Sequence, residues 1–261
     1  MRRAESYFVG SAIFHYLGPS FAVLLFARVA PLGVAWLRIL TAAVVFALWR
    51  GPRIRLDRVV LAWAAVLAAM NCCFYLAIDR LPLATVAAIE FLPVIGLAAL
   101  GARTRRNAAA LALAVPGVYV LTGVRLAGHP AGVAFALANA VLFAGYIVCA
   151  DRAAKDGRGI DALAGAMLLA AVLVTPFGAT GVGLAAAAAG AGVGICSSVV
   201  PYVLDQLALA RLPRATYSLM VSILPATATV VGLVVLAQVP SLRDLGGIGL
   251  VAGGVVLHRP V

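Results

Sequence analysis

Ten apolar segments, each long enough to cross a lipid bilayer as a helix, follow one another along this chain. A helix that crosses the hydrocarbon needs about 20 residues, because each residue adds about 1.5 Å of rise. The predicted spans are 6–27, 31–49, 58–78, 83–101, 107–124, 130–150, 160–177, 183–209, 214–237 and 242–257. Only short connections remain between them. The sequence therefore predicts an all-α membrane protein of ten transmembrane helices, without a soluble domain.

The composition excludes a soluble fold. Hydrophobic residues make up 64% of the 261 residues and charged residues 11%. Ordinary soluble domains are about 45–50% apolar and about 25% charged. A water-soluble fold could not bury so many apolar side chains, so a polytopic membrane protein is the class that remains.

The basic residues are distributed unevenly between the connections. If the N-terminus is cytoplasmic, the cytoplasmic segments hold fifteen of the Lys and Arg residues and the opposite side holds four. Cytoplasmic loops collect basic residues in this way, so we expect both termini in the cytoplasm. The net charge of +11 then has its origin in membrane topology, and we expect no nucleic-acid partner.

A six-residue motif occurs twice. Residues 80–85 read RLPLAT and residues 211–216 read RLPRAT, five identities at an offset of 131 residues. The offset is close to half the chain, which indicates a duplication. Since each half would hold five spans, the second copy enters the membrane from the opposite side. We predict two inverted-topology repeats, residues 1–125 and 126–261, an architecture in which secondary transporters bind cargo near the bilayer midplane.

Two carboxylates lie inside predicted spans, at Glu90 and Asp205. Insertion scales assign an acidic residue at the helix centre a cost of about 2.5–3.5 kcal/mol, so each should face a cavity and take a proton or a substrate ammonium. For Glu90 the alternative is a structural ion pair with Arg38. Ser198, Tyr202 and Asp205 share one helix face by their spacing, although simple interhelical hydrogen bonding would also explain the two hydroxyls.

Other polar residues within the spans are weaker candidates. Asn71 and Tyr75, four residues apart, would orient a carboxylate or hydroxyl, or join helices. Arg38 would bind a substrate carboxylate, neutralise Glu90 or extend toward the membrane surface. Ser222 belongs to a polar stripe that also suits tight packing, and His15 suits either a structural role or proton relay. The predicted substrate-binding and coupling residues are Glu90, Asp205, Asn71, Tyr75, Tyr202, Arg38, Ser222 and His15.

The sequence shows no pattern of enzyme chemistry. The three histidines are scattered, no glycine-rich phosphate loop precedes a lysine, and no serine nucleophile lies near a base. The four cysteines lie in apolar runs without metal-binding spacing and suit packing. We expect no catalytic residue, no metal and no cofactor.

The double hairpin, its Leu-Pro corners and the glycine-rich fifth and tenth spans resemble the drug/metabolite transporter superfamily with its paired EamA domains. Within it the chain is similar to the bacterial threonine/homoserine exporter type. The stretches that show the likeness are Met70-Asn71, Phe74-Tyr75-Leu76, Glu90-Phe91, Pro201-Tyr202-Val203-Leu204-Asp205, Ala208-Leu209 and Leu212-Pro213. That branch usually has Glu on the eighth span, where this chain has Asp205.

The resemblance implies export of a small polar metabolite, such as an amino acid, from the cytoplasm across the bacterial inner membrane. It also implies alternating access, with proton antiport as the expected coupling. Two other functions stay open on the sequence. One is a carrier of the same fold for a cationic drug or another metabolite, and the other is a non-transporting membrane subunit that scaffolds a complex. The sequence predicts no oligomeric state.

Overall fold

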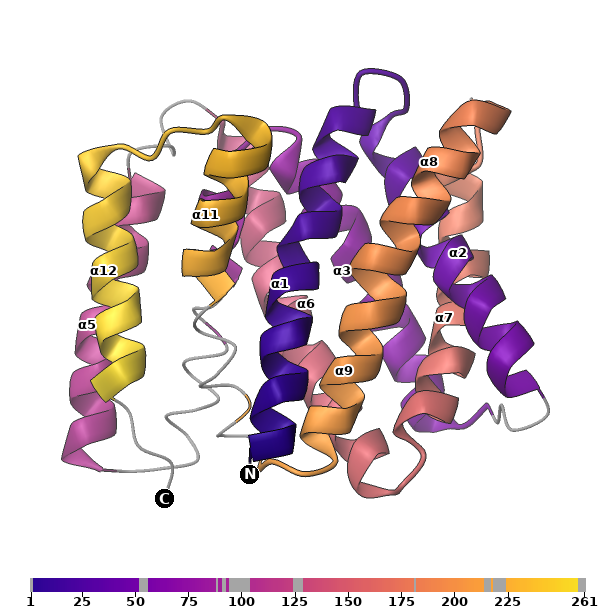
Figure 1. The fold of residues 1–261 in the computed structure, drawn as a ribbon, viewed down its shortest axis with the longest axis horizontal. Helices are drawn as coiled ribbons and strands as arrows, with labels where there is room; N and C mark the ends of the chain where they lie inside the picture. Colours follow the sequence, from indigo (N-terminus) through magenta and orange to yellow (C-terminus); the bar gives the residue numbers. More distant parts are fainter. Residues whose placement is uncertain are drawn as a thin grey trace.

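The structure is a computed structural model, which describes residues 2–51, 56–87, 89–90, 93, 104–123, 129–180, 182–213, 217 and 224–257. Throughout these residues the regular structure is helical and contains no β-strand. Figure 1 shows the helices standing roughly side by side, as in a membrane bundle. The predicted all-α class is therefore confirmed for the described part of the chain.

Among the described residues, six helical stretches are long and apolar enough to cross a membrane. They are α1 (Arg2–Leu25), α2 (Pro31–Arg50), α3 (Arg58–Ile78), α6 (Pro130–Lys155), α7 (Gly159–Gly178) and the continuous stretch of α8 (Leu184–Gly194), a π-helical turn η2 (Ile195–Val199) and α9 (Val200–Leu209). The other described helices are α5 (Arg105–Gly123), α11 (Leu224–Leu236) and α12 (Leu242–Leu257).

The predicted spans 83–101 and 214–237 lie partly outside the described residues. The arrangement of ten spans in two inverted repeats therefore stays a prediction, as do the repeat boundaries.

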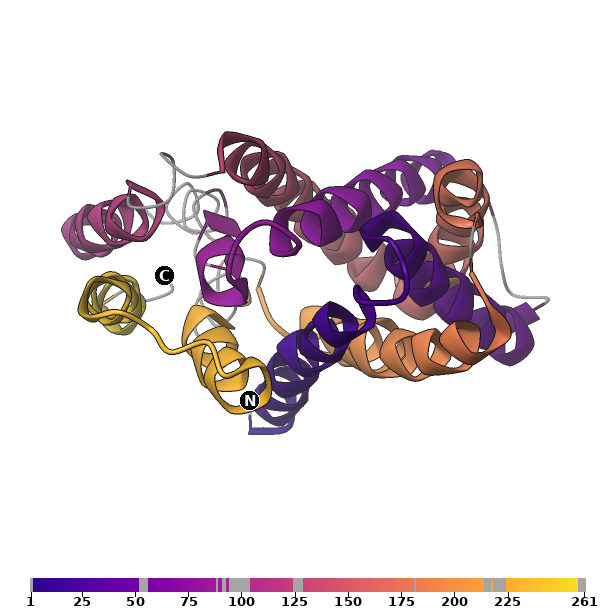
Figure 2. The ribbon, with the colours of Figure 1, turned by 90° about the horizontal axis from the view of Figure 1, so that it is seen from above.

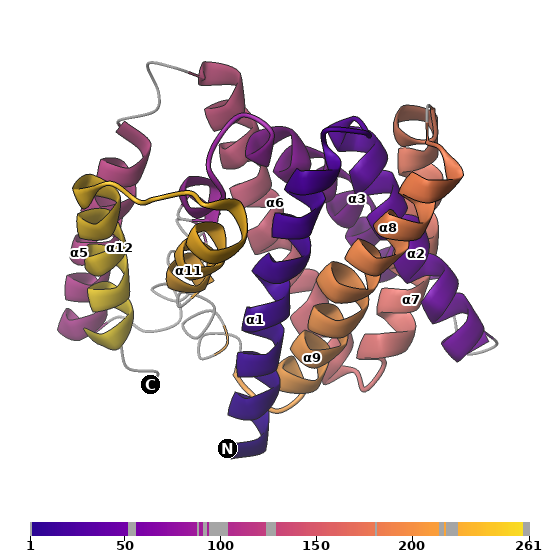
Figure 3. The same ribbon diagram turned by 45° about the horizontal axis from the view of Figure 1, so that its top comes forward.

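The helices form a main bundle with a pair at one edge. In the bundle, α3 packs against α6 and α7, α2 against α7 and α8, and α1 against α9 and α11. Figures 1 and 2 show α5 and α12 side by side at the edge of the molecule. Figure 3 shows that α1 begins and α12 ends at the same end of the bundle. We call this end, where α2, α6 and α9 also finish, the basic end.

Local capping explains the turns at the basic end. The carboxylate of Asp57 accepts hydrogen bonds from the backbone N–H groups of Val59 and Val60, at 2.9 and 3.0 Å, and so caps the start of α3. After α6 the backbone turns at Gly157, whose φ of +71° lies in the region that favours glycine. Lys155 donates hydrogen bonds to the carbonyl oxygens of Leu209 and Leu212, which lack helical donors beyond the end of α9.

Two ion pairs also join helices at the basic end. Arg50, the last residue of α2, contacts Asp161 in the first turn of α7 at 2.5 Å. Arg158 contacts Asp57 at 2.8 Å and so connects the α6–α7 turn to the start of α3. These contacts fix the start of α7 against its neighbours.

Candidate functional site

Polar and charged side chains gather inside the apolar bundle. Arg38, Glu90 and Asp205 are 4%, 3% and 1% exposed, respectively. A charged side chain this deep is costly in a membrane bundle unless it faces partners or a cavity. The three side chains are therefore the natural starting points for the site.

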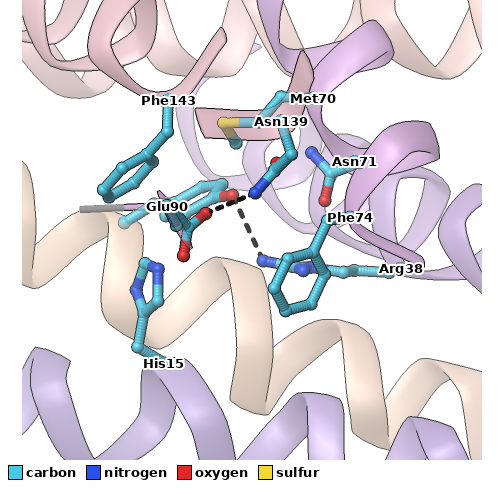
Figure 4. Close-up of a pocket in the computed structure, with 9 residues that line it drawn as sticks. His15, Arg38, Met70, Asn71, Phe74, Glu90, Asn139 and Phe143 are labelled. Atoms are coloured by element: carbon cyan, nitrogen blue, oxygen red, sulfur yellow. Dashed lines mark hydrogen bonds between the residues drawn. The ribbon is translucent and has the colours of Figure 1, made fainter. Parts of the chain in front are cut away.

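The carboxylate of Glu90 is held by neutral donors. The Tyr16 hydroxyl on α1 donates to Oε2 at 3.1 Å, and the Asn139 amide on α6 donates to Oε1 at 2.8 Å. Figure 4 shows the Asn139 amide directed at this carboxylate. Within the described residues, Glu90 forms no ion pair with Arg38. A structural Arg38–Glu90 pair, which the sequence allowed, is therefore not what orders either side chain.

The guanidinium of Arg38 is bound by the stretch where η2 meets α9. Its Nε donates to Ser198 Oγ at 2.6 Å, and its Nη2 donates to Ser197 O at 2.6 Å and to Tyr202 Oη at 3.1 Å. The rings of Tyr75 and Tyr202 lie 5.7 and 5.6 Å from the guanidinium carbon, within cation–π distance. Arg38 is buried and does not extend to the membrane surface.

The sequence explains why Ser197 accepts a side-chain donor. In a regular α-helix its carbonyl would bond the N–H four residues later, and that residue is Pro201, which has none. The helix widens into the π-turn 195–199 just before this proline. Such single π-turns occur frequently at functional sites. Arg38 thus binds the carbonyl whose usual donor, the N–H four residues later, is missing.

A small cavity lies between these groups. It has a volume of about 10 Å³ and is lined by His15, Arg38, Met70, Asn71, Phe74, Glu90, Asn139, Phe143 and Tyr202. Figure 4 shows Arg38 and Glu90 on different sides of this cavity. Three buried atoms of its lining have no hydrogen-bond partner, namely His15 Nδ1, Asn71 Oδ1 and Asn139 Oδ1. Buried polar atoms are normally satisfied, so these atoms indicate a site for a polar ligand.

Asp205 belongs to a second polar cluster. The Ser11 hydroxyl donates to its Oδ1, the Tyr146 hydroxyl donates to its Oδ2 at 3.3 Å, and the Tyr217 hydroxyl is a further hydrogen-bond partner. The rings of Tyr146 and Tyr202 pack at 5.2 Å. Because Tyr202 lines the cavity and Tyr146 binds Asp205, this ring pair joins the second cluster to the cavity.

The predicted site residues fall into four groups. Glu90, Arg38, Asn71, Tyr202 and His15 line the cavity. Asp205 lies in the second cluster, Tyr75 packs beside Arg38 without lining the cavity, and Ser222 lies outside the described residues. Ser198, Tyr202 and Asp205, predicted to act from one helix face, divide their contacts between the two clusters.

Five partners of the carboxylates are absent from the predicted set: Tyr16, Asn139, Ser11, Tyr146 and Tyr217. Asn139 and Tyr146 lie seven residues apart and therefore share one face of α6. That spacing indicates that both side chains could face the same site. Ser11 and Tyr16 are ordinary residues of an apolar helix, and no local pattern distinguishes them.

The fold and the site together define the chain as a multi-pass α-helical membrane protein with a charged polar centre around a small cavity. Residues 130–258 match the EamA-like transporter family. The threonine/homoserine exporter RhtA of Escherichia coli strain K12 is 31% identical over 247 residues, which cover 90% of this chain and 83% of RhtA. The chain belongs to the EamA-like transporter family.

Further comparisons agree. The threonine/homoserine exporter RhtA of Salmonella typhimurium strain LT2 is 31% identical over 234 residues, 85% of this chain and 79% of that protein. A crystal structure of another protein shares the fold, with a TM-score of 0.71 at 20% identity over 98% of this chain and 96% of the other. The family and both exporters are transporters rather than enzymes, with a membrane and a small molecule as partners.

Proposed function

We propose that this chain is a secondary transporter that exports a small zwitterionic amino acid of the threonine or homoserine type across the bacterial inner membrane. The observation that supports it is one cavity with Arg38 and Glu90 in its wall, two opposite charges that do not neutralise each other by direct contact. A free amino acid carries the matching pair of charges, a carboxylate and an ammonium.

Arg38 keeps donors for a cargo carboxylate. A guanidinium has five N–H groups, and the hydrogen bonds to Ser197, Ser198 and Tyr202 use those of Nε and Nη2. The two N–H groups of Nη1 take no part in these three hydrogen bonds. A carboxylate accepted there gains a charge-assisted bond in a dry site, where such bonds are strong.

Glu90, Asn71 and Asn139 are suited to bind the ammonium and the side-chain hydroxyl of such an amino acid. The carboxylate of Glu90 has only neutral donors, Tyr16 and Asn139, so an ammonium would be its first cationic partner. The free carbonyl oxygens of Asn71 and Asn139 would accept from the ammonium or from a side-chain hydroxyl. A cargo hydroxyl recognised in this way would favour threonine or homoserine over an aliphatic amino acid of equal size.

The cavity volume supports a transport cycle. A volume of about 10 Å³ holds about one water molecule and no amino acid. Cargo therefore enters only if the helices around the cavity separate, as alternating access between residues 1–125 and 126–261 would require. Pro19 in α1 leaves the carbonyl of His15 without its helical donor and provides a bend beside the cavity.

Asp205 is the proposed proton site. It lies outside the cavity lining, and its described partners are hydroxyl groups that bind either a carboxylate or a carboxylic acid. The Tyr146–Tyr202 ring contact links it to the cargo site, so protonation at Asp205 and occupancy at Arg38 would influence each other. With both termini in the cytoplasm, this arrangement gives export in exchange for protons.

Counter-transport in proteoliposomes tests the proposal. Vesicles with purified protein and internal unlabelled threonine should accumulate external labelled threonine, homoserine should compete, and an imposed proton gradient should drive net movement. Competition by an organic cation without competition by amino acids would instead support the cationic-drug carrier. A protein that moves neither would support the scaffold function and overturn the proposal.

A further inference from the structure

Gln206, the residue after Asp205 on α9, has a buried amide without partners. Its side chain is 2% exposed, and neither Oε1 nor Nε2 makes a hydrogen bond. A buried amide leaves water unfavourably unless both its donor and its acceptor are satisfied. The proposed transport mechanism gives this side chain no role. Its unpaired amide therefore suggests a ligand other than cargo bound in the central cavity.

Gln206 lies in the wall of a second pocket, at the basic end. This pocket has a volume of about 170 Å³ and is lined by Arg50, Ala154, Gly157, Arg158, Gly159, Ile160, Asp161, Gln206, Leu207 and Ala210. We call it the α7 pocket, because it surrounds the first turn of α7. It shares no lining residue with the central cavity.

Gly159, the first residue of α7, lies close to the Gln206 amide. A Cβ atom at Gly159 would lie 2.3 Å from Gln206 Oε1, so only glycine lets the amide approach the helix start this closely. The first N–H groups of a helix lack helical acceptors, and α7 begins at Gly159. Gly159, at the start of α7, and Gln206 both line the α7 pocket.

Charged side chains of both signs line the α7 pocket. Arg50 is paired with Asp161 through Nε, and Arg158 is paired with Asp57 through Nη2. Neither guanidinium makes another hydrogen bond within the described residues, so both keep N–H groups for a carboxylate. Asp161 supplies an anionic partner for an ammonium. The lining thus holds two guanidiniums and one carboxylate, while the second carboxylate, Asp57, pairs with Arg158 from outside the lining, so a ligand with both a carboxylate and an ammonium would meet groups of both signs.

We infer that the α7 pocket is a second binding site for a small zwitterionic amino acid, with the Gln206 amide as its uncharged donor and acceptor. The inference rests on the proposed function, which supplies the class of cargo and the cytoplasmic position of the basic end. Cargo for export arrives from that side. The α7 pocket would hold it one residue along α9 from Asp205, before the central cavity opens.

Calorimetric titration of the purified protein with L-threonine tests the inference. Wild type should bind two equivalents, and Gln206→Leu should bind one. Ala210→Leu, which fills the pocket from an exposed position, should also bind one. Glu90→Gln should keep the α7 pocket and weaken the central site. Ala138→Leu, the same change at an exposed position of α6, should bind two.

The outcomes separate this inference from the proposed function. A single wild-type equivalent that Glu90→Gln weakens and Gln206→Leu and Ala210→Leu leave unchanged would overturn the α7 pocket and keep the transporter. Displacement of the second equivalent by inorganic phosphate would overturn the zwitterion class of ligand. No threonine binding by wild type would overturn both proposals.

Discussion

Arg38 on α2 donates a hydrogen bond to the backbone carbonyl of Ser197, 159 residues away, at 2.6 Å. The residue four positions later, which would donate to that carbonyl in a regular α-helix, is Pro201 and has no N–H. A break in one helix therefore positions the guanidinium of another, and the charged cavity depends on this pairing.

Replacement of Pro201 by alanine should weaken cargo binding by about tenfold or more. Alanine restores an N–H that competes with Arg38 for the Ser197 carbonyl, and a hydrogen bond to a charged group is worth about 1.5–3 kcal/mol. The measurement is the threonine dissociation constant. Pro176→Ala, at an exposed proline inside α7, is the matched control and should bind as wild type. Equal affinity for both variants would argue against the role of the proline.

Arg38→Lys should bind cargo far more weakly than wild type although the positive charge is kept. Lysine cannot bond Ser198, Ser197 and Tyr202 in the fixed geometry of a guanidinium and still present a donor pair to a carboxylate. Initial rates of threonine counter-transport measure the effect. Wild-type rates for this variant would show that a point charge suffices.

Asn139→Leu should lower the free energy of unfolding by about 1–3 kcal/mol, because it leaves one oxygen of the buried Glu90 carboxylate without its donor. The double variant Glu90→Leu with Asn139→Leu should recover part of this loss, since no unpaired carboxylate remains. Unfolding in denaturant in a mild detergent measures both. A double variant less stable than the sum of the two single changes would contradict this explanation.

The Asp57 cap should make stability depend on pH. The backbone N–H of Val60 and the hydrogen bond from Arg158 lower the pKa of this carboxyl below its ordinary 3.8. A lowered pKa in the folded state stabilises the protein fully above pH 3.8, and this contribution is lost as the pH falls through the lowered value.

Thermal unfolding as a function of pH tests the role of Asp57. Asp57→Ser keeps a capping oxygen without a titrating group, so its melting temperature should fall less than that of wild type on acidification. Parallel curves for the two proteins would show that Asp57 makes no such contribution.

The helical class and the buried charges could be predicted because they depend on local sequence. A long apolar segment indicates a membrane helix. An arginine or glutamate within such a segment can be recognised as a candidate site residue from the segment alone, without knowledge of the tertiary structure. Arg38 and Glu90 were found for this reason, and both line the cavity.

The hydrogen-bond partners of the buried carboxylates could not be predicted from the sequence, because they come from segments that are distant along the chain. Ser11 binds Asp205 across 194 residues and Tyr16 binds Glu90 across 74. Helical spacing assumes 3.6 residues per turn, so it did not anticipate the π-turn 195–199. Ser198 and Tyr202 contact Arg38, whereas Asp205 contacts a different cluster. The duplication remains a prediction from the repeated corner, whose second copy ends outside the described residues.

The central claim is that Arg38 holds the carboxylate and Glu90 the ammonium of one cargo molecule. Calorimetric titration with L-threonine, its methyl ester and its N-acetyl derivative, on wild type, Arg38→Met and Glu90→Gln, tests it most directly. We predict that at the central site wild type prefers threonine, that Arg38→Met no longer discriminates against the ester, and that Glu90→Gln no longer discriminates against the N-acetyl compound. Unchanged preference for threonine in both variants would contradict the account.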